Sequence, residues 1–123
     1  MRFRATRMQG TPAYCHCRTC RRASGAPLVA WITVARDGFS FTKGRPRSYR
    51  SSRRVVRRFC RACGTPLSYE NDAWPGVIDL TTASLDAPER FPPRDHVWTR
   101  HALAWLRLGD RLPRHREFRP KPS

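Results

Sequence analysis

The sequence predicts a mainly β fold made of short antiparallel strands, and two observations carry that prediction. Short runs rich in aromatic and β-branched residues alternate with Gly, Pro, Asn and Asp, which is the pattern of hairpins and meanders. The five cysteines fall into two close groups, and a small domain with a thin core often depends on metal or disulfides for stability. The 123 residues, of which 39% are hydrophobic, leave room for one such domain.

The N-terminal part of the chain contains the clearest elements. Residues 1–11 are basic, and we expect them to form a poorly ordered arm or one irregular strand. Residues 18–27 suit a short helical turn, because Gly25 and Pro27 would end it. Residues 28–35 place alternate apolar side chains on two faces and are the best strand candidate in the chain.

The rest of the chain is expected to add short strands joined by irregular connections. Strands are predicted at residues 39–42, 47–52, 53–59, 67–70 and 76–82. An irregular connection over 83–96, a short strand near 97–99 and an ambiguous stretch, helical or extended, through Leu106 follow. The domain would then span residues 12–119, between the basic arm 1–11 and a loose tail at 120–123.

The charge of the chain is strongly positive, at +16, and residues 38–69 contain no acid at all. Such a segment attracts phosphate backbones or an anionic ligand. Only Lys43 and Lys121 of the 25 basic residues are lysines, a skew that resembles a composition bias. Charge alone supports steering and non-specific contact, so nucleic-acid binding is possible but not the favoured main role.

Cysteine usage predicts the compartment. An odd cysteine count, close metal-type spacing and the lack of an apolar run at the N-terminus favour a reducing environment, and we expect a cytoplasmic protein. No stretch approaches the roughly 18 to 20 apolar residues that a membrane span needs, so no membrane association is expected. The sequence also lacks a Ser-His-Asp order, a phosphate-binding glycine loop and paired carboxylates at a telling spacing.

Three cysteines, Cys15, Cys17 and Cys20, lie within six positions of one another. Structural zinc sites fill all four tetrahedral corners with protein ligands, whereas catalytic sites use three and leave one for water or substrate. Three thiols with no nearby fourth therefore predict a catalytic type of zinc site. His16 lies between two of them and should point the opposite way, so we expect it to stabilise the turn or contact substrate.

The second group is Cys60 and Cys63, followed by a glycine that lets the backbone fold around a metal. Two arrangements are compatible with the five cysteines. Both groups share one ion, with four of the five cysteines binding, or two ions are bound and the second lacks part of its shell. Zinc sites that only hold the fold together are the plain alternative for both groups.

Four stretches of the chain together resemble one known family. They are CHCRTCRRASGAP, FCRACGTPLSY, VIDLTTASLD and HVWTRHALAWLRLGDRLPRH. The chain is similar in these stretches to the glutathione-dependent formaldehyde-activating enzyme family, which includes proteins resembling centromere protein V. The resemblance implies an all-β zinc fold like that of Mss4. It also implies carbon–sulfur lyase chemistry, in which formaldehyde and glutathione condense to S-hydroxymethylglutathione.

The resemblance also implies roles for the cysteines. By position, Cys15, Cys17 and Cys20 match the ligands of the family's catalytic zinc, and Cys60 and Cys63 match the second pair of its structural zinc. The first pair of that structural site, a C-x-C-G motif upstream of the triple, is absent from this sequence. Either the true start lies upstream of Met1, or this member has lost its structural zinc. We therefore expect one catalytic Zn²⁺, while a second, structural ion would lack ligands.

The function expected from these residues is that of a zinc-dependent lyase acting on a thiol–aldehyde adduct, with a small thiol such as glutathione as its partner. Arginines near the thiols are candidates for holding substrate carboxylates: Arg18, Arg21, Arg22 and Arg61. His96 and His101 are candidate proton donors, and neither is assigned that role. The alternative is a zinc-stabilised basic module that binds nucleic acid or an acidic partner.

Overall fold

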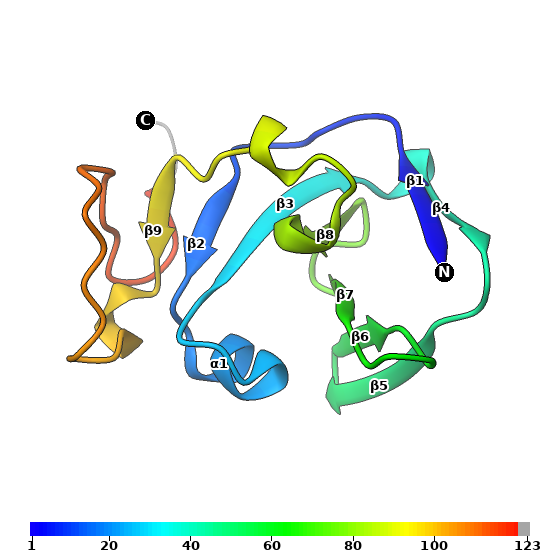
Figure 1. The fold of residues 1–123 in the computed structure, drawn as a ribbon, viewed down its shortest axis with the longest axis horizontal. Coiled ribbons are helices and arrows are strands. Elements are labelled where there is room, and N and C mark those ends of the chain that lie inside the picture. The colour runs from blue at the N-terminus through cyan, green and yellow to red at the C-terminus, as the bar shows by residue number, and fades with distance from the viewer. Residues whose placement is uncertain (121–123) are drawn as a thin grey trace.

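The computed structural model describes residues 1–120 and contains two sheets and one α-helix (Figure 1). The strands are β1 (Arg2–Ala5), β2 (Ala13–Cys15), β3 (Val29–Ala35), β4 (Phe39–Lys43), β5 (Arg47–Ser52), β6 (Val55–Phe59), β7 (Pro66–Asn71), β8 (Val77–Thr81) and β9 (Asp95–Val97). The helix is α1 (Arg18–Ser24). Short 3-10 turns occur at Arg36–Gly38, Thr82–Ser84, Pro88–Arg90 and Thr99–His101.

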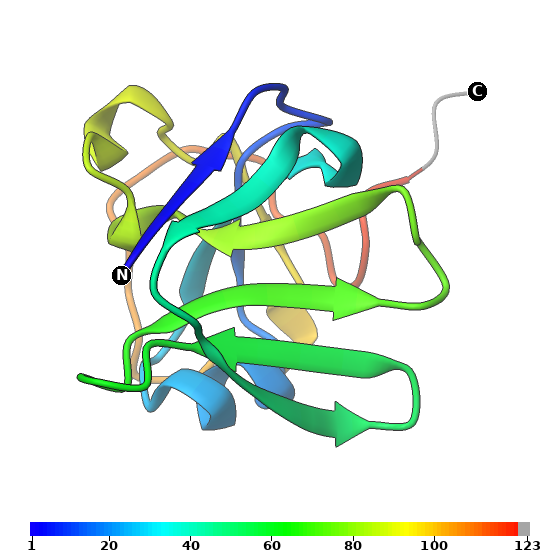
Figure 2. The ribbon, with the colours of Figure 1, turned by 90° about the vertical axis from the view of Figure 1, so that its right-hand side faces the viewer.

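Seven strands form the large sheet, in the order β5-β6-β7-β8-β3-β2-β9, and β1 pairs with β4 in a separate ribbon. The strands β5, β6, β7 and β8 form an antiparallel meander, which Figure 2 shows as arrows lying side by side. The pairing is antiparallel throughout except between β2 and β9, which run parallel. The prediction of a mainly β fold with short antiparallel strands is confirmed, and this one parallel pair is the exception.

The hydrophobic core lies on one face of the large sheet. Ile32 pairs with Leu80 and Val34 with Ile78 across β3 and β8, and all four side chains are buried. Residues directly opposite in an antiparallel pair project from the same face, so the register stacks them into one layer. The β1–β4 ribbon and Phe91 pack against this layer and close the core.

The other face of the large sheet carries a different set of side chains, and we call it the polar face. Arg57 pairs with Tyr69, Tyr69 with Asp79, and Asp79 with Thr33, which forms a row across four strands. The strand β2 continues the same face, because Cys15 pairs with Val29 and every second residue of β3 projects the same way. The sheet therefore separates an apolar core side from a polar side that contains a cysteine.

Several predicted boundaries shift in the structure. The segment 1–11 contains β1, which pairs with β4 with a register irregularity after Arg2, so its strand alternative describes it better than a poorly ordered arm. The strand predicted at 97–99 lies at Asp95–Val97 instead, because Thr99 already begins a 3-10 turn. The stretch through Leu106 is neither helix nor strand after that turn. Of the predicted tail, residues 121–123 lie outside the described residues.

No helix in the described part of the chain is both long enough and apolar enough to cross a membrane. The single α-helix has seven residues, and its role is local.

Replacing Ile78 with Ala should strongly destabilise the protein. The Ile78 side chain is fully buried, at 0% exposure, so truncation removes buried methyl groups and leaves a cavity between β8 and the ribbon. We expect a loss of about 2–5 kcal/mol in the free energy of unfolding, measured by urea denaturation. The exposed Leu108→Ala is the control and should cost less than about 1 kcal/mol. Equal losses for both variants would contradict the assignment of the core.

Asp79 should make the protein less stable as the pH rises. Burial raises the pKa of the Asp79 carboxyl, and the hydroxyl of Thr33, which donates to Oδ1, offsets only part of this rise. The folded state therefore holds the proton more tightly than the unfolded chain, so this contribution is present below the unfolded pKa of about 4 and is lost as the pH rises through the folded value. Asp79→Asn should be more stable than the wild type at pH 7, with the difference shrinking towards pH 4. Thermal unfolding over this pH range tests it, and an Asn variant that is less stable at pH 7 would refute it.

Candidate metal centre

The sulfur atoms of Cys15, Cys17 and Cys20 all lie within 4.8 Å of one another. Within residues 1–120 no other group of three or more His, Cys, Asp or Glu side chains meets this criterion. Zinc–sulfur bonds of about 2.3 Å in tetrahedral array place neighbouring sulfurs about 3.8 Å apart, so the observed cluster is already close to that spacing. The structure therefore brings together all three residues of the predicted triple.

Local backbone geometry explains why the three sulfurs converge. Cys15 ends β2, Cys17 is the N-cap of α1, and Cys20 lies in the first turn of the helix. The Cys17 sulfur accepts a hydrogen bond from the backbone N–H of Cys20 at 3.4 Å, in place of the oxygen that usually caps a helix. Gly25 ends the helix at a φ of 69°, in the left-handed region that favours glycine, as the sequence predicted.

The thiols share their protons unequally. Hydrogen bonds from the neighbouring Cys15 and Cys20 lower the pKa of Cys17, and contacts with the Thr19 hydroxyl and the Cys20 N–H lower it further. The same hydrogen bonds to Cys17 and Cys20, together with burial, raise the pKa of Cys15. Negative charge therefore gathers on Cys17 while a neighbour keeps its proton. A soft divalent cation would replace that proton, and this donor set of three thiols fits Zn²⁺.

His16 lies on the opposite face of β2 from Cys15, as the alternation of a strand predicts. Its side chain is 1% exposed, and its Nε2 lies 2.8 Å from Nδ1 of His96. Burial, followed by the nearby His96, lowers the pKa of His16 to about 4, so its ring is neutral at pH 7. His16 therefore anchors the backbone between two thiols without joining the sulfur cluster.

His96 continues this buried chain towards solvent. Its Nε2 lies 3.1 and 3.0 Å from the two carboxylate oxygens of Asp110, and its ring stacks on Tyr14 at 4.9 Å. A carboxylate can only accept, so Nε2 donates to Asp110, and Nδ1 of a neutral ring is left to accept from His16. His96 lies on the core side of β2, so the structure does not place this candidate proton donor at the sulfurs. His101 stacks on Trp98 instead.

Cys60 and Cys63 form a separate site at the turn between β6 and β7. The turn closes through a hydrogen bond from the N–H of Gly64 to the Cys60 carbonyl at 2.7 Å, with Gly64 at a φ of 79°. The Thr65 hydroxyl lies 3.1 Å from the Cys63 sulfur and is the main cause that lowers the pKa of this exposed thiol to about 7. Neither cysteine joins the sulfur cluster of the triple, so the arrangement in which four cysteines share one ion is not found among the described residues. Metal binding by this pair stays a prediction.

The polar face brings to the cluster residues that the sequence analysis missed. The guanidinium of Arg57 lies 5.0 Å from the ring centre of Tyr69, whose ring lies 6.1 Å from that of Trp31. The pKa of Cys20 is raised overall; the hydrogen bond with Cys15 opposes the rise most strongly and the Arg57 charge least. Burial raises the pKa of Tyr69, with a small contribution from the Cys20 charge. The strand register places Arg57 and Tyr69 on the same face of the sheet as Cys15. Strand alternation within residues 53–58 predicts the face of the sheet from which Arg57 projects. Only the strand register identifies the side chains beside it.

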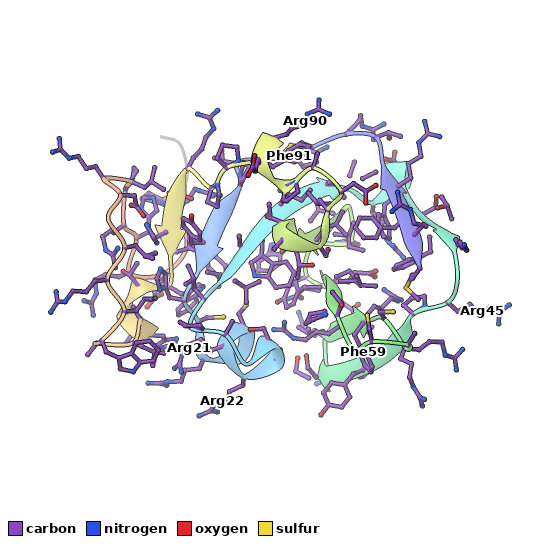
Figure 3. The ribbon with its side chains drawn as sticks, in the orientation of Figure 1. Arg21, Arg22, Arg45, Phe59, Arg90 and Phe91 are labelled. Atoms are coloured by element: carbon purple, nitrogen blue, oxygen red, sulfur yellow. The ribbon has the colours of Figure 1, made fainter. Side chains whose placement is uncertain are left out.

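The four arginines expected to hold substrate lie elsewhere or at the edge of the site. Arg18, Arg22 and Arg61 are exposed, and Figure 3 shows Arg22 reaching outward from the end of α1. Arg21 and Arg22 line a hollow of about 300 Å³ beside Trp105, and no cysteine contributes to it. The structure thus places none of the four in contact with the three sulfurs.

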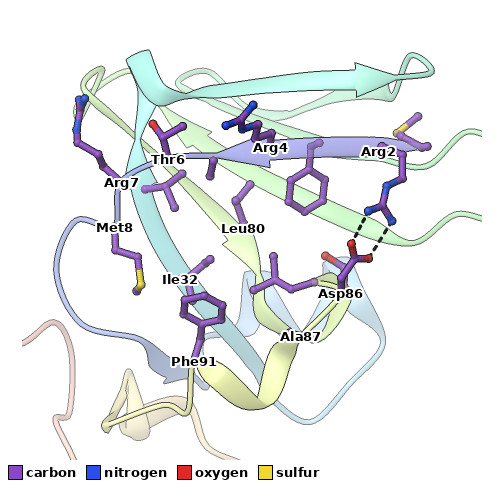
Figure 4. Close-up of a pocket in the computed structure, with 16 residues that line it drawn as sticks. Arg2, Arg4, Thr6, Arg7, Met8, Ile32, Leu80, Asp86, Ala87 and Phe91 are labelled. Atoms are coloured by element: carbon purple, nitrogen blue, oxygen red, sulfur yellow. Dashed lines mark hydrogen bonds and ion pairs between the residues drawn. The ribbon is translucent and has the colours of Figure 1, made fainter.

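A larger hollow, of about 430 Å³, lies on the core side of the molecule (Figure 4). It is lined by β1 and by the apolar side chains of Ile32, Leu80 and Phe91, and the ion pair between Arg2 and Asp86 lies at its edge. None of the cysteines lines it. The hollow is therefore distinct from the thiol cluster, and the chemistry of the cluster does not depend on it.

Two of three comparisons with known proteins find a similar fold or a similar sequence. A crystal structure of a Rhodobacter sphaeroides protein, solved as a structural-genomics target, is similar to this fold with a TM-score of 0.57 and 22% sequence identity, over 68% of this chain and 78% of that one. Comparison with curated proteins gives no match. The sequence model of the glutathione-dependent formaldehyde-activating enzymes matches residues 1–101, which include β1 and both cysteine groups. The chain belongs to the glutathione-dependent formaldehyde-activating enzyme family.

Proposed function

We propose that the protein is a zinc-dependent carbon–sulfur lyase that acts on the adduct of a small thiol and an aldehyde, with glutathione and formaldehyde as the pair that the family name indicates. The observation that carries the proposal is the cluster of three thiols with no fourth His, Cys, Asp or Glu ligand beside it in residues 1–120. Three protein ligands and one free corner are what a zinc site needs to accept a substrate.

Each residue of the triple has a role in this proposal. Cys15, Cys17 and Cys20 would hold the ion, and burial of the first and third keeps competing water away from two of the three sulfurs. Zinc, when bound, supplies the positive charge that keeps a thiol deprotonated at neutral pH. The substrate thiolate adds to the aldehyde carbon: a carbon–sulfur bond forms, the carbonyl π bond breaks, and the oxygen takes up a proton. The reverse steps cleave the adduct.

Charge balance supports the participation of nearby arginine. Three thiolates around a divalent ion leave a net negative site, which is costly in a half-buried position unless a cation lies close. Arg57 is such a cation. Its charge opposes the rise in the pKa of Cys20 even when the thiols hold no metal. The five free thiols also fit a reducing compartment such as the cytoplasm.

Cys60 and Cys63 have a second, structural role in the proposal. They would bind a separate ion at the β6–β7 turn, with further ligands that residues 1–120 do not bring to them. Such an ion would fasten the end of β6, the strand that carries Arg57.

The second candidate function is a basic binding module. The observation in its favour is the set of exposed arginines on and around the β5–β6 hairpin: Arg45, Arg47, Arg50, Arg53 and Arg54. Salt titrations of binding to double-stranded DNA separate the two functions. A lyase should show only weak binding that disappears as salt rises, whereas a binding module should keep measurable affinity at physiological salt and lose none of it in Cys17→Ser.

Replacing Cys17 with Ser should remove one zinc ion per chain and nearly all turnover. A hydroxyl is a far poorer zinc ligand than a thiolate, so we expect activity to fall by more than about 100-fold. Serine is also a good N-cap, so α1 should still form. Zinc content by elemental analysis and exchange between glutathione, formaldehyde and their adduct by NMR are the measurements.

The control for this variant is the metal-free protein. Wild type and Cys17→Ser should unfold at similar temperatures in the presence of a chelator, because both can cap the helix. A wild type that binds no zinc under reducing conditions, or a Cys17→Ser variant with full activity, would overturn the proposed function.

A further inference from the structure

We propose that Arg57 is the residue that selects the substrate: its guanidinium, held over the ring of Tyr69 on the polar face, binds a carboxylate of the incoming thiol compound. The inference rests on the proposed function and adds to it a residue that determines specificity. It also narrows the substrate class to thiols that carry a carboxylate.

The strand register places Arg57 on the side of the sheet that carries the cluster. Arg57 and Tyr69 are direct partners across β6 and β7, so their side chains project from the same face. The register continues through Asp79 and Thr33 to β3, and from Val29 to Cys15 on β2. Arg58, the next residue along β6, projects from the other face and pairs with Glu70.

Arg57 differs from Arg58 in having no acidic partner. Within residues 1–120 no carboxylate forms an ion pair with Arg57, and no hydrogen bond ends on its guanidinium. The residue is nevertheless half-buried, in a chain that leaves most other arginines exposed. A half-buried cation without a carboxylate partner is costly unless the thiolates of the metal site or a bound ligand supply the negative charge.

Tyr69 holds the guanidinium in a fixed position. The guanidinium carbon lies 5.0 Å from the centre of the Tyr69 ring, within the range of a cation–π contact, and this contact uses none of the N–H donors of the guanidinium. Those N–H groups form a fork that matches the two oxygens of a carboxylate. Trp31 extends the aromatic surface from Tyr69 towards β2, which offers an apolar wall for the part of the substrate between its carboxylate and its sulfur.

The position of Arg57 relative to the sulfurs suits a substrate bound at both ends. Arg57 and Cys15 project from the same face of the sheet, and Asp79 lies in the row of side chains between Tyr69 and Thr33. A thiol compound whose sulfur occupies the free corner of the cluster would then extend its carboxylate along the polar face to Arg57. A thiol without a carboxylate could bind at the sulfur cluster but could not bind Arg57.

The test compares two ligands that differ only in their carboxyl groups. S-Methylglutathione and its diethyl ester, titrated calorimetrically into the zinc-loaded protein, report binding without turnover. Wild type should bind the free acid about 10- to 100-fold more tightly than the ester, the range expected for a charge-assisted pair. Arg57→Gln should lose most of this preference, and Arg57→Lys should recover part of it.

Arg54→Gln is the matched control, because it removes the same charge from an exposed position in the neighbouring turn. It should keep the preference of the wild type within about twofold, since exposed charges act weakly at a distance. An unchanged preference in Arg57→Gln, or equal weakening of both ligands, would overturn the inference. A fall in zinc affinity in Arg57→Gln without a change in preference would leave Arg57 only its charge-balancing role at the metal site, and would also overturn the inference.

The proposed function can fail separately. Arg57-dependent binding of the free acid in a protein that does not interconvert glutathione, formaldehyde and their adduct would leave the specificity inference standing and remove the lyase. Turnover with the same kcat/KM for glutathione and its diethyl ester would leave the lyase standing and remove the specificity inference.

Discussion

The convergence of three sulfurs at the junction of β2 and α1 is the constraint on which the rest of the site depends. The Cys17 sulfur satisfies two requirements at once, because it caps the helix through the Cys20 N–H and contacts the other two thiols. The helix can therefore begin immediately after the strand, and the short link keeps Cys15 and Cys20 close. A longer connection would let the three thiols separate, and they could then no longer converge on one ion.

The two faces of β2 carry side chains with different roles. Cys15 projects to the polar face, whereas Tyr14 and His16 project to the side where His96 lies. The hydrogen bonds from His16 through His96 to Asp110 hold the cysteine segment from the face of β2 opposite Cys15. The aromatic and cationic side chains of β3, β6 and β7 gather on the other face. This division explains how a chain with so few buried residues keeps a defined site.

Local signals in the sequence were sufficient for most of the fold and for the sulfur cluster. The alternation of residues 28–35 and the stop signal at Gly25 predicted β3 and α1, because both elements depend on interactions between residues close in the sequence. The cluster followed from spacing alone. The environment of His96 did not follow, because it depends on the pairing of β2 with a strand some 80 residues later. The pairing of Arg57 with Tyr69 did not follow either, because a register shift between Arg58 and Phe59 interrupts the β6–β7 ladder. For the same reason, the sequence pointed to arginines adjacent to the cysteines, while the structure favours one on another strand.

The parallel pairing of β9 with β2 has a consequence for the synthesis of the protein. Antiparallel neighbours can form as soon as a hairpin emerges, but a parallel partner from the far end of the chain must wait until nearly everything between has been made. Until β9 arrives, the cysteine segment lacks its backbone partner on that side and the histidine that anchors it. The thiols are then at their most exposed to oxidants and to unwanted metals. Reductant and metal present during synthesis would therefore meet the cysteine segment before its last strand pairing has formed.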